Sequence, residues 1–247
     1  MSVCRRVDTA PVSNGIEDYA LIGDTETAAL VGRDGSIDWM CAPRFDSPAC
    51  FAALLGDVSN GRWKIAPAGE PTAVRRRYRP GSLVLETEFD TAEGTVRVVD
   101  CMPPRTKYPD VVRMVEGVSG TVAVVMELIV RFDYGSVVPW ARRVEGGMHY
   151  IGGPDALTLF SAVPIESRDL TTFARFTITA GDRVPFTLAW HPSFMPGPRI
   201  SNASELVEHT TKWWTDWSSR STYTGRYDEA VNRSLVTLKA LTYAPTG

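Results

Sequence analysis

Carboxylate side chains are the groups in this sequence best suited to acid–base chemistry. Asp34, Asp38 and Asp46 lie close together near the start of the chain, and a pair of carboxyl groups can protonate a leaving group and activate a water molecule. Asp34, however, belongs to a turn, and strand alternation directs Asp38 toward solvent. Glu86 and Glu88 alternate with apolar residues as the solvated face of a strand would. These carboxylates are therefore interpreted as structural, and no catalytic residue is predicted.

A stiff loop lies within the same region. Residues 27–31 and 36–40 indicate the two strands of a hairpin, and Gly35 supplies the positive φ that closes such a turn. Pro43 and Pro48 fix their own φ angles and favour extended backbone at the residues before them. The loop between these prolines is therefore expected to be rigid, as loops that hold binding side chains commonly are.

The candidate substrate-binding residues are Trp39, Arg44, Phe45 and Asp46. A guanidinium and a carboxylate can hold the hydroxyl groups of a ligand through charge-assisted hydrogen bonds. The alternative is structural: Arg44 and Asp46 pair with each other to brace the loop, while Trp39 and Phe45 fill the core.

Histidine and cysteine predict neither a metal site nor a cofactor site. The histidines are scattered, and His191, at the end of an apolar strand, is interpreted as a hydrogen-bonded structural residue. The cysteines lack C-x-x-C spacing and are predicted to be free thiols. No glycine-rich phosphate loop is present. The residues concerned are His149, His191 and His209, and Cys4, Cys41, Cys50 and Cys101.

Composition and charge exclude several classes of partner. A formal net charge of -3 and a pI near 5.7 imply no broad basic face, so nucleic acid is not expected to bind. The basic run 75–77 looks like a solvated strand. The apolar stretch 121–130 is too short to span a membrane and is interrupted by Glu127. No signal-peptide-like run begins the chain, so a cytoplasmic location is predicted.

Short alternating segments predict the fold class, a mainly β antiparallel sandwich. About ten strands are expected, with a hairpin turn at Ser119-Gly120 between strands 111–118 and 122–132. Residues 1–15 are predicted to be a flexible N-terminus and 16–199 the sandwich domain. Helical turns are expected at 16–22 and over 49–55. The other strands are expected over 61–66, 73–78, 83–89, 95–102, 147–151, 156–161, 171–178 and 184–190.

Two C-terminal segments have helical periodicity. Residues 201–217 form an amphipathic pattern that Ser201 is expected to cap, within a linker helix assigned to 200–220. Residues 227–240 form a second helix within 221–247. The tryptophans of the first helix, Trp213, Trp214 and Trp217, have the composition of a sugar-binding platform. Their helical spacing favours packing of the sandwich against a following domain.

Several strings resemble the N-terminal domain of bacterial trehalase/glucoamylase-like proteins of glycoside hydrolase family 15. They occupy residues 16–24, 27–55, 61–67, 78–80, 213–214 and 231–247, and include Ala42-Pro43-Arg44-Phe45-Asp46-Ser47-Pro48. The resemblance implies a β-supersandwich, a linker helix and an (α/α)6 barrel. It places two glutamates in the barrel, a general acid and a general base, which hydrolyse an α-glucosidic bond with inversion of the anomeric configuration. The chain is expected to end in the first barrel helix as a truncated product that is itself inactive.

The resemblance also implies the partners and the role of the stiff loop. The parent would hydrolyse α,α-trehalose or an α-glucan, and the sandwich would pack on its own (α/α)6 catalytic domain. Trp39, Arg44, Phe45 and Asp46 would then reach toward the barrel's substrate pocket. Alternatives are a stand-alone carbohydrate-binding or interaction module and a scaffold that helps the barrel to fold. An exposed apolar face on helix 228–242 is expected to promote self-association.

Overall fold

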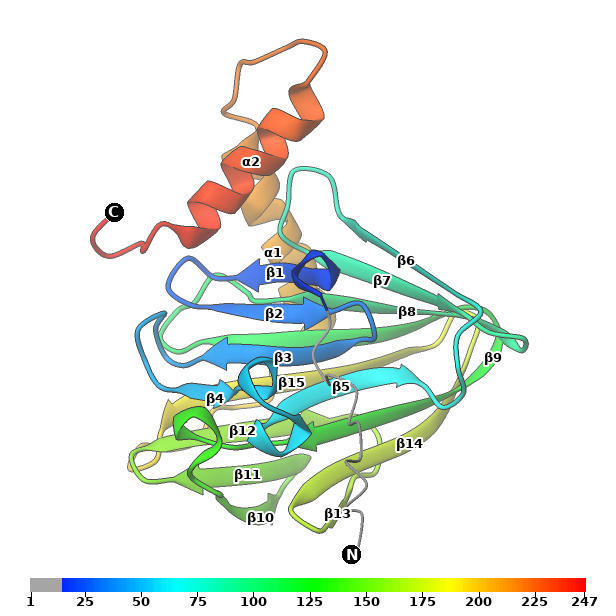
Figure 1. The fold of residues 1–247 in the computed structure, drawn as a ribbon, viewed down its shortest axis with the longest axis vertical. Coiled ribbons are helices and arrows are strands. Elements are labelled where there is room, and N and C mark those ends of the chain that lie inside the picture. Colours follow the sequence, from blue (N-terminus) through cyan, green and yellow to red (C-terminus); the bar gives the residue numbers. More distant parts are fainter. Residues whose placement is uncertain (1–14) are drawn as a thin grey trace, which may run out of the picture.

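The computed structural model describes residues 15–247, so the predicted flexible segment 1–15 lies, apart from Gly15, outside the described residues. Fifteen strands form one antiparallel network that is folded into two packed layers (Figure 1). This architecture confirms the mainly β prediction. Among the described residues, no helix is long and apolar enough to cross a membrane.

The two layers share their longest strand, β9. The first layer contains β1 (Tyr19–Gly23), β2 (Ala28–Gly32), β3 (Ser36–Cys41), β4 (Ala49–Phe51), β5 (Arg62–Pro67), β9 (Asp110–Ile129), β13 (Glu166–Arg168) and β14 (Thr171–Thr179). The second contains β6 (Ala73–Tyr78), β7 (Leu85–Asp90), β8 (Gly94–Cys101), β9, β10 (Trp140–Val144), β11 (Gly147–Gly152), β12 (Asp155–Ser161) and β15 (Arg183–Pro192).

The predicted hairpin at Ser119-Gly120 is wrong, because β9 continues through this point. Its first half pairs with β8 and β15, and its second half pairs with β5 and β14. Ser119 and Gly120 remain in the ladder, opposite Thr95 and Gly94. The Ser-Gly sequence is typical of a hairpin turn, whereas Gly120 (φ 63°) lies inside β9, near the point where this strand passes from one layer to the other.

The strand passes between layers where Gly117 touches another chain segment. A Cβ atom at Gly117 would lie 2.1 Å from the carbonyl oxygen of Thr179. The Gly117 N–H donates to Asp182 O, and Gly181 N–H donates to Gly117 O. Residues 179–182 connect β14 in one layer to β15 in the other. Two connections between the layers are therefore held together at this glycine.

The core lies between the layers and continues under the first helix. Trp63, Phe51, Phe89 and Phe186 are fully buried in the interlayer core. A second cluster on the outer face of β8 and β9 packs against α1 (Ala203–Ser218), through residues that include Val112. Alternate residues of β9 therefore bury on opposite faces, which explains its nearly continuous apolar sequence.

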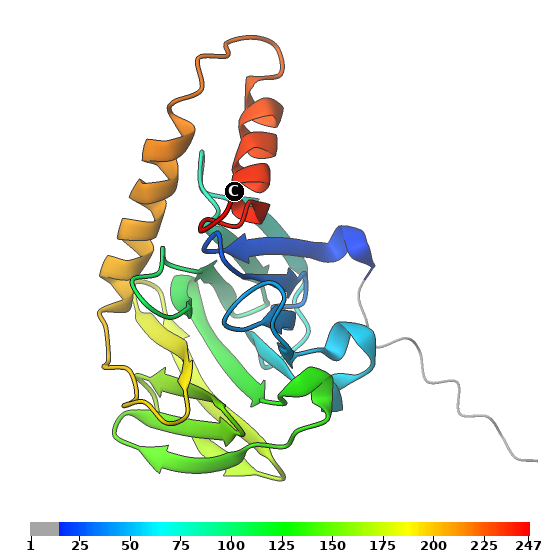
Figure 2. The same cartoon turned by 90° about the vertical axis from the view of Figure 1, so that its left-hand side faces the viewer.

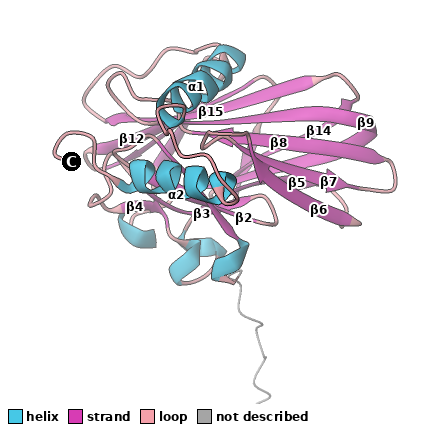
Figure 3. Ribbon diagram, turned by 90° about the horizontal axis from the view of Figure 1, so that it is seen from above, coloured by secondary structure: helices cyan, strands magenta, loops and turns pink. Residues whose placement is uncertain are grey.

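The two predicted helices are present as α1 and α2 (Asp228–Leu241), and they project side by side beyond the layers (Figure 2). Seen from above, they lie over one end of the sandwich (Figure 3). The cap of α1 is Asn202 rather than the predicted Ser201; its side chain accepts from the N–H groups of Ser204 and Glu205.

The tryptophans of α1 pack within the described fold. Trp214 is buried against Leu83 of the sandwich and Val236 and Ala240 of α2. The ring of Trp213 meets that of Trp214 edge-on at 4.9 Å. The tryptophans therefore pack between the sandwich and α2, and the predicted packing against a following domain stays a prediction.

Other local predictions need correction. The helix expected over 49–55 is instead β4 followed by a 3₁₀ turn, Ala53–Leu55, because Ala49, Cys50 and Phe51 join the edge of β3. The expected helical turn at 16–22 covers only Ile16–Asp18, before β1 begins. The short strands β10 and β13 were not predicted.

Glu86 and Glu88 are not a solvated face. Glu86 is buried and bonded to Arg77 and Arg79, and Glu88 pairs with Arg97. Asp38, expected in solvent, is also buried, and it accepts hydrogen bonds from Tyr19 and Ser36. In each case a neighbouring polar group replaces water, so simple alternation misassigned the side chain.

Candidate functional site

The site is built around the turn between β1 and β2, residues 24–27. Asp24 accepts hydrogen bonds from the N–H groups of Glu26 and Thr27, at 2.9 and 2.8 Å. Thr25 adopts a positive φ of 72°. The buried carboxylate of Asp24 also bonds Arg105, from the β8–β9 connection, at 2.8 Å. The turn is thus fixed from within and by a neighbouring loop.

Two further segments attach to the same turn by backbone hydrogen bonds. The N–H of Phe45 donates to Glu26 O at 3.0 Å, which fastens the β3–β4 loop. The N–H of Ala244 donates to Thr25 O at 2.9 Å, which fastens the segment after α2. The rings of Phe45 and Tyr243 meet edge-on at 6.4 Å. The loop containing the candidate residues therefore adjoins the C-terminal segment.

Arg44 and Asp46 pair with each other on the surface of this loop. Nε and Nη2 of Arg44 donate to the two carboxylate oxygens of Asp46, at 2.9 and 2.7 Å. Their side chains are 53% and 71% exposed. The pairing lowers the pKa of Asp46, and the hydrogen bonds and charge of Asp46, together with Tyr243, raise the pKa of Arg44. Both groups stay ionised and accessible to a ligand or a neighbouring domain.

Trp39 is separate from the other three candidates. It packs against Cys41, Ala49 and Ala52, and its ring lies 6.0 Å from that of Tyr134. Arg44, Phe45 and Asp46 therefore lie together, whereas Trp39 is half-buried beside a different loop. The bracing pair and the packed tryptophan are the features of the structural alternative. Whether the loop also binds a ligand stays a prediction.

The predicted acidic and thiol groups do not form a reactive centre within residues 15–247. Asp34 pairs with Lys64 at 2.8 Å, the buried Asp38 accepts from Tyr19 and Ser36, and Asp46 bonds Arg44, so each of these carboxylates is engaged by a structural partner. The described cysteines are free and buried, and burial raises the pKa of Cys41 to about 11. Cys4 lies outside the described residues. No group of metal-ligating side chains occurs in this part of the chain.

Sequence reasoning missed two neighbourhoods. Tyr243 joins the loop, although only the resemblance string 231–247 indicated that its segment mattered. His149 and His191 stack with ring centroids 5.2 Å apart, although they were considered scattered. The register of β11, β12 and β15 brings them together, and that register cannot be deduced from their spacing alone.

The sequence is similar to known proteins along most of its length. Residues 9–185 match the family described as "Trehalase-like, N-terminal". The chain is 33% identical to a trehalase of Mycobacterium tuberculosis, over 94% of this chain and 38% of that protein. It is 34% identical to a trehalase of Mycolicibacterium smegmatis, over 94% of this chain and 39% of that protein. The chain thus spans about two fifths of the length of these relatives.

A solved structure shares the fold. A bacterial glucoamylase in complex with acarbose superposes with a TM-score of 0.67, covering 90% of this chain and 40% of that one. The two sequences are 8% identical over this match, so the likeness concerns architecture alone.

Proposed function

Because the chain belongs to the trehalase-like N-terminal family, we propose that it is the non-catalytic N-terminal domain of an inverting α-glucosidase. The substrate of the parent would be α,α-trehalose or an α-glucan. The domain would pack on an (α/α)6 catalytic domain and shape its substrate pocket. The observation that carries this proposal is that 94% of the chain matches only 38% of a trehalase.

The face around the β1–β2 turn is the proposed contact with the catalytic domain. It carries the exposed Arg44–Asp46 pair and the Phe45–Tyr243 ring contact. The backbone bond from Ala244 to Thr25 holds the segment after α2 on the same face. A catalytic domain joined to this segment would lie beside the β3–β4 loop that contains Arg44. Arg44 and Asp46 would then position sugar hydroxyls at the rim of the pocket without taking part in bond cleavage.

The test is Arg44→Ala in the complete polypeptide, assayed with trehalose and maltooligosaccharides. We expect KM to rise several-fold, because a positioned guanidinium is lost, while the midpoint of thermal unfolding changes little. Arg168→Ala is the control, because Arg168, at the end of β13, forms an even more exposed pair with Asp169 away from the loop. Unchanged kinetics with lower stability would make the loop purely structural.

A second measurement tests whether catalysis belongs to another domain of the parent. The 247-residue chain alone is expected to hydrolyse neither trehalose nor maltooligosaccharides. The two catalytic glutamates are expected in the catalytic domain of the parent. Turnover by the 247-residue chain would contradict a non-catalytic role.

A second candidate function is a carbohydrate-binding module, which one cavity favours. This cavity, of about 840 Å³, lies between the β6–β7 connection and the α1–α2 connection. Tyr223 and Tyr227 line it and are 48% and 60% exposed, and Arg226, Asn232 and Arg233 supply hydrogen-bond donors. Aromatic faces beside planar polar groups suit a sugar ring. Calorimetric titration with maltooligosaccharides tests this candidate, and loss of the binding heat in Tyr227→Ala would support it.

A further inference from the structure

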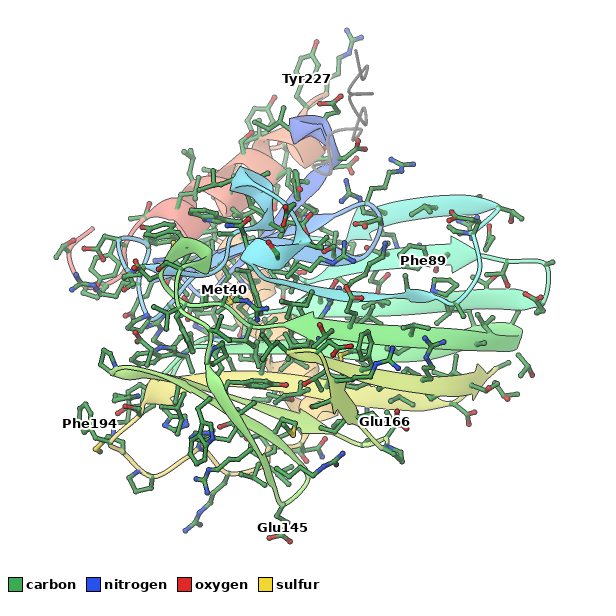
Figure 4. The ribbon with its side chains drawn as sticks, turned by 60° about the horizontal axis from the view of Figure 1, so that its bottom comes forward. Met40, Phe89, Glu145, Glu166, Phe194 and Tyr227 are labelled. Carbon is green, nitrogen blue, oxygen red and sulfur yellow. The ribbon has the colours of Figure 1, made fainter. Side chains whose placement is uncertain are left out.

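A second cavity lies on the outer face of the other end of the sandwich. Its volume is about 600 Å³, which is in the range of small-molecule sites. The outer faces of β10, β11, β12 and β15 form its floor, and the loop that leads to α1, residues 193–200, forms a wall. Figure 4 shows Glu145 and Phe194 projecting from this part of the molecule. None of the residues that define the candidate loop site lines it.

Its floor contains a hydrogen-bonded chain with a fixed direction. Nδ1 of His191 lies 3.0 Å from the carbonyl oxygen of Pro192, which can only accept, so this nitrogen carries the proton. Nε2 of His191 is then an acceptor, and the hydroxyl group of Thr158 donates a hydrogen bond to it at 3.3 Å. The Thr158 oxygen in turn accepts from Nδ1 of His149, at 2.9 Å.

This series of hydrogen bonds leaves Nε2 of His149 as an acceptor with a fixed orientation. This nitrogen has no hydrogen-bond partner within residues 15–247, yet it is not among their fully enclosed unpaired atoms. His149 lines the cavity, so the lone pair is available to a ligand that brings a hydroxyl or N–H donor. Burial lowers the pKa of both histidines, and the neighbouring His191 and Arg142 lower the pKa of His149 further, which favours the neutral form of each ring.

The charged groups around this acceptor are mainly basic. Arg142 lies directly opposite His149 in the β10–β11 register, and side chains in such pairs share one face. Arg199 lines the wall, and Glu145 is the one acidic residue of the lining. Within the described chain neither arginine forms an ion pair. Two unpaired guanidinium groups thus face the cavity beside one carboxylate.

We propose that this cavity binds a small molecule carrying both hydroxyl groups and an anionic oxygen group, such as a phosphorylated monosaccharide. A ligand hydroxyl would donate to Nε2 of His149, and the anionic oxygens would accept from Arg142 and Arg199. Ile151, Phe160 and Met195 supply the apolar part of the wall. The site is separate from the Arg44 loop and does not depend on the enzymatic role of the parent.

The test is calorimetric titration of the 247-residue chain with three probes at equal ionic strength. Glucose 6-phosphate carries both required groups, glucose lacks the anion, and inorganic sulfate lacks the carbon-bound hydroxyls. We expect glucose 6-phosphate to bind at least about tenfold more tightly than either of the others, which is about 1.4 kcal/mol. Equal affinity for sulfate and glucose 6-phosphate, or no heat with glucose 6-phosphate at millimolar concentration, would overturn the proposal.

Variants connect the binding heat to the cavity. Arg142→Ala removes an exposed side chain and is expected to weaken binding of glucose 6-phosphate at least about tenfold. The charge-matched control is Arg175→Ala on β14, in the other layer, which should bind normally. Binding that survives Arg142→Ala unchanged would place the ligand elsewhere and overturn the assignment.

The hydrogen-bonded chain has its own readout. Long-range ¹H–¹⁵N spectra should show His149 in the Nδ1–H form in the unmodified protein. Thr158→Val removes the acceptor of that proton, so the variant should show a mixed tautomer and weaker binding of glucose 6-phosphate. An Nε2–H tautomer of His149 in the unmodified protein would contradict the proposed direction of the chain.

Discussion

The guanidinium of Arg113 and the carboxylate of Asp100 form an ion pair with no solvent exposure of either side chain. Nε of Arg113 lies 2.7 Å from Asp100 Oδ1, and its Nη1 and Nη2 donate to the carbonyl oxygens of Trp63 and Gly35. Arg113 also lies over the Trp63 ring at 5.2 Å. One side chain of β9 therefore links β8 in its own layer to β5 and to the β2–β3 turn in the other.

Removing the arginine should be strongly destabilising. Arg113→Ala leaves the buried carboxylate of Asp100 without its guanidinium partner and removes one donor from each of two carbonyl oxygens. We therefore expect the free energy of unfolding to fall by about 3–5 kcal/mol. Urea denaturation followed by circular dichroism measures this loss. Lys212→Ala, which breaks the exposed Lys212–Asp216 pair, is the control and should change stability by less than about 1 kcal/mol. Comparable losses in both variants would contradict a special role for Arg113.

The glycine where β9 changes layers should not tolerate a side chain. Gly117→Ala would place a Cβ atom against the Thr179 carbonyl, and we expect a loss of about 1–3 kcal/mol from the resulting displacement. Thermal unfolding measures it. Gly69→Ala is the matched control, since no atom lies within 4 Å of a Cβ at that position. A neutral Gly117→Ala would show that the contact between the two crossings is loose.

Asp110 should make stability depend on pH. Burial and the charge of Asp24 raise the pKa of Asp110 from 3.8 to about 6. Between these values the folded state holds a proton that the unfolded chain has released. The contribution of Asp110 is therefore most favourable below about pH 4, and it is lost as the pH rises through about 6.

Asp110→Asn isolates this effect. Above about pH 6.5 the variant should be more stable than the unmodified protein, by at most about 3 kcal/mol, and the difference should vanish near pH 4. Melting temperatures of both proteins across this range provide the measurement. A difference that is constant with pH would show that Asp110 does not titrate in this way.

The exposed face of α2 should promote association. Leu238 and Leu241 are 63% and 55% exposed, whereas Val236 and Ala240 pack inward. The predicted apolar exposure is therefore present, and self-association follows as a prediction. Analytical ultracentrifugation should show concentration-dependent association that the pair Leu238→Glu and Leu241→Glu abolishes. Lys239→Glu, between them, is a control for charge alone, and a monomer at every concentration would refute the prediction.

Local patterns predicted most of the fold, and long-range pairing accounts for what they missed. The Gly35 turn, the strand 73–78 and both C-terminal helices follow from residues close together in the chain. The continuous β9 could not be predicted, because its two halves have different partners. The alternating strands predicted an antiparallel sandwich, and the resemblance implied the same architecture.

The candidate site was predictable in part. The prolines correctly indicated a defined loop, and the Arg44–Asp46 pair was foreseen as the structural alternative. Its attachment to Thr25 and Tyr243 depends on contacts across the whole chain. The Arg113–Asp100 pair and the stacked histidines were not predicted for the same reason. Neither the charge of a residue nor its position in the sequence shows which residue of another strand it will contact.

Because both layers share β9, the two layers are expected to unfold together. Neither layer retains a complete set of strand partners if the other is lost, because each contains half of β9. Hydrogen exchange at the central amides of β9 should therefore require global opening and report a single cooperative unit. Separately expressed halves of the sandwich, cut anywhere along this strand, would lack the pairing needed to fold.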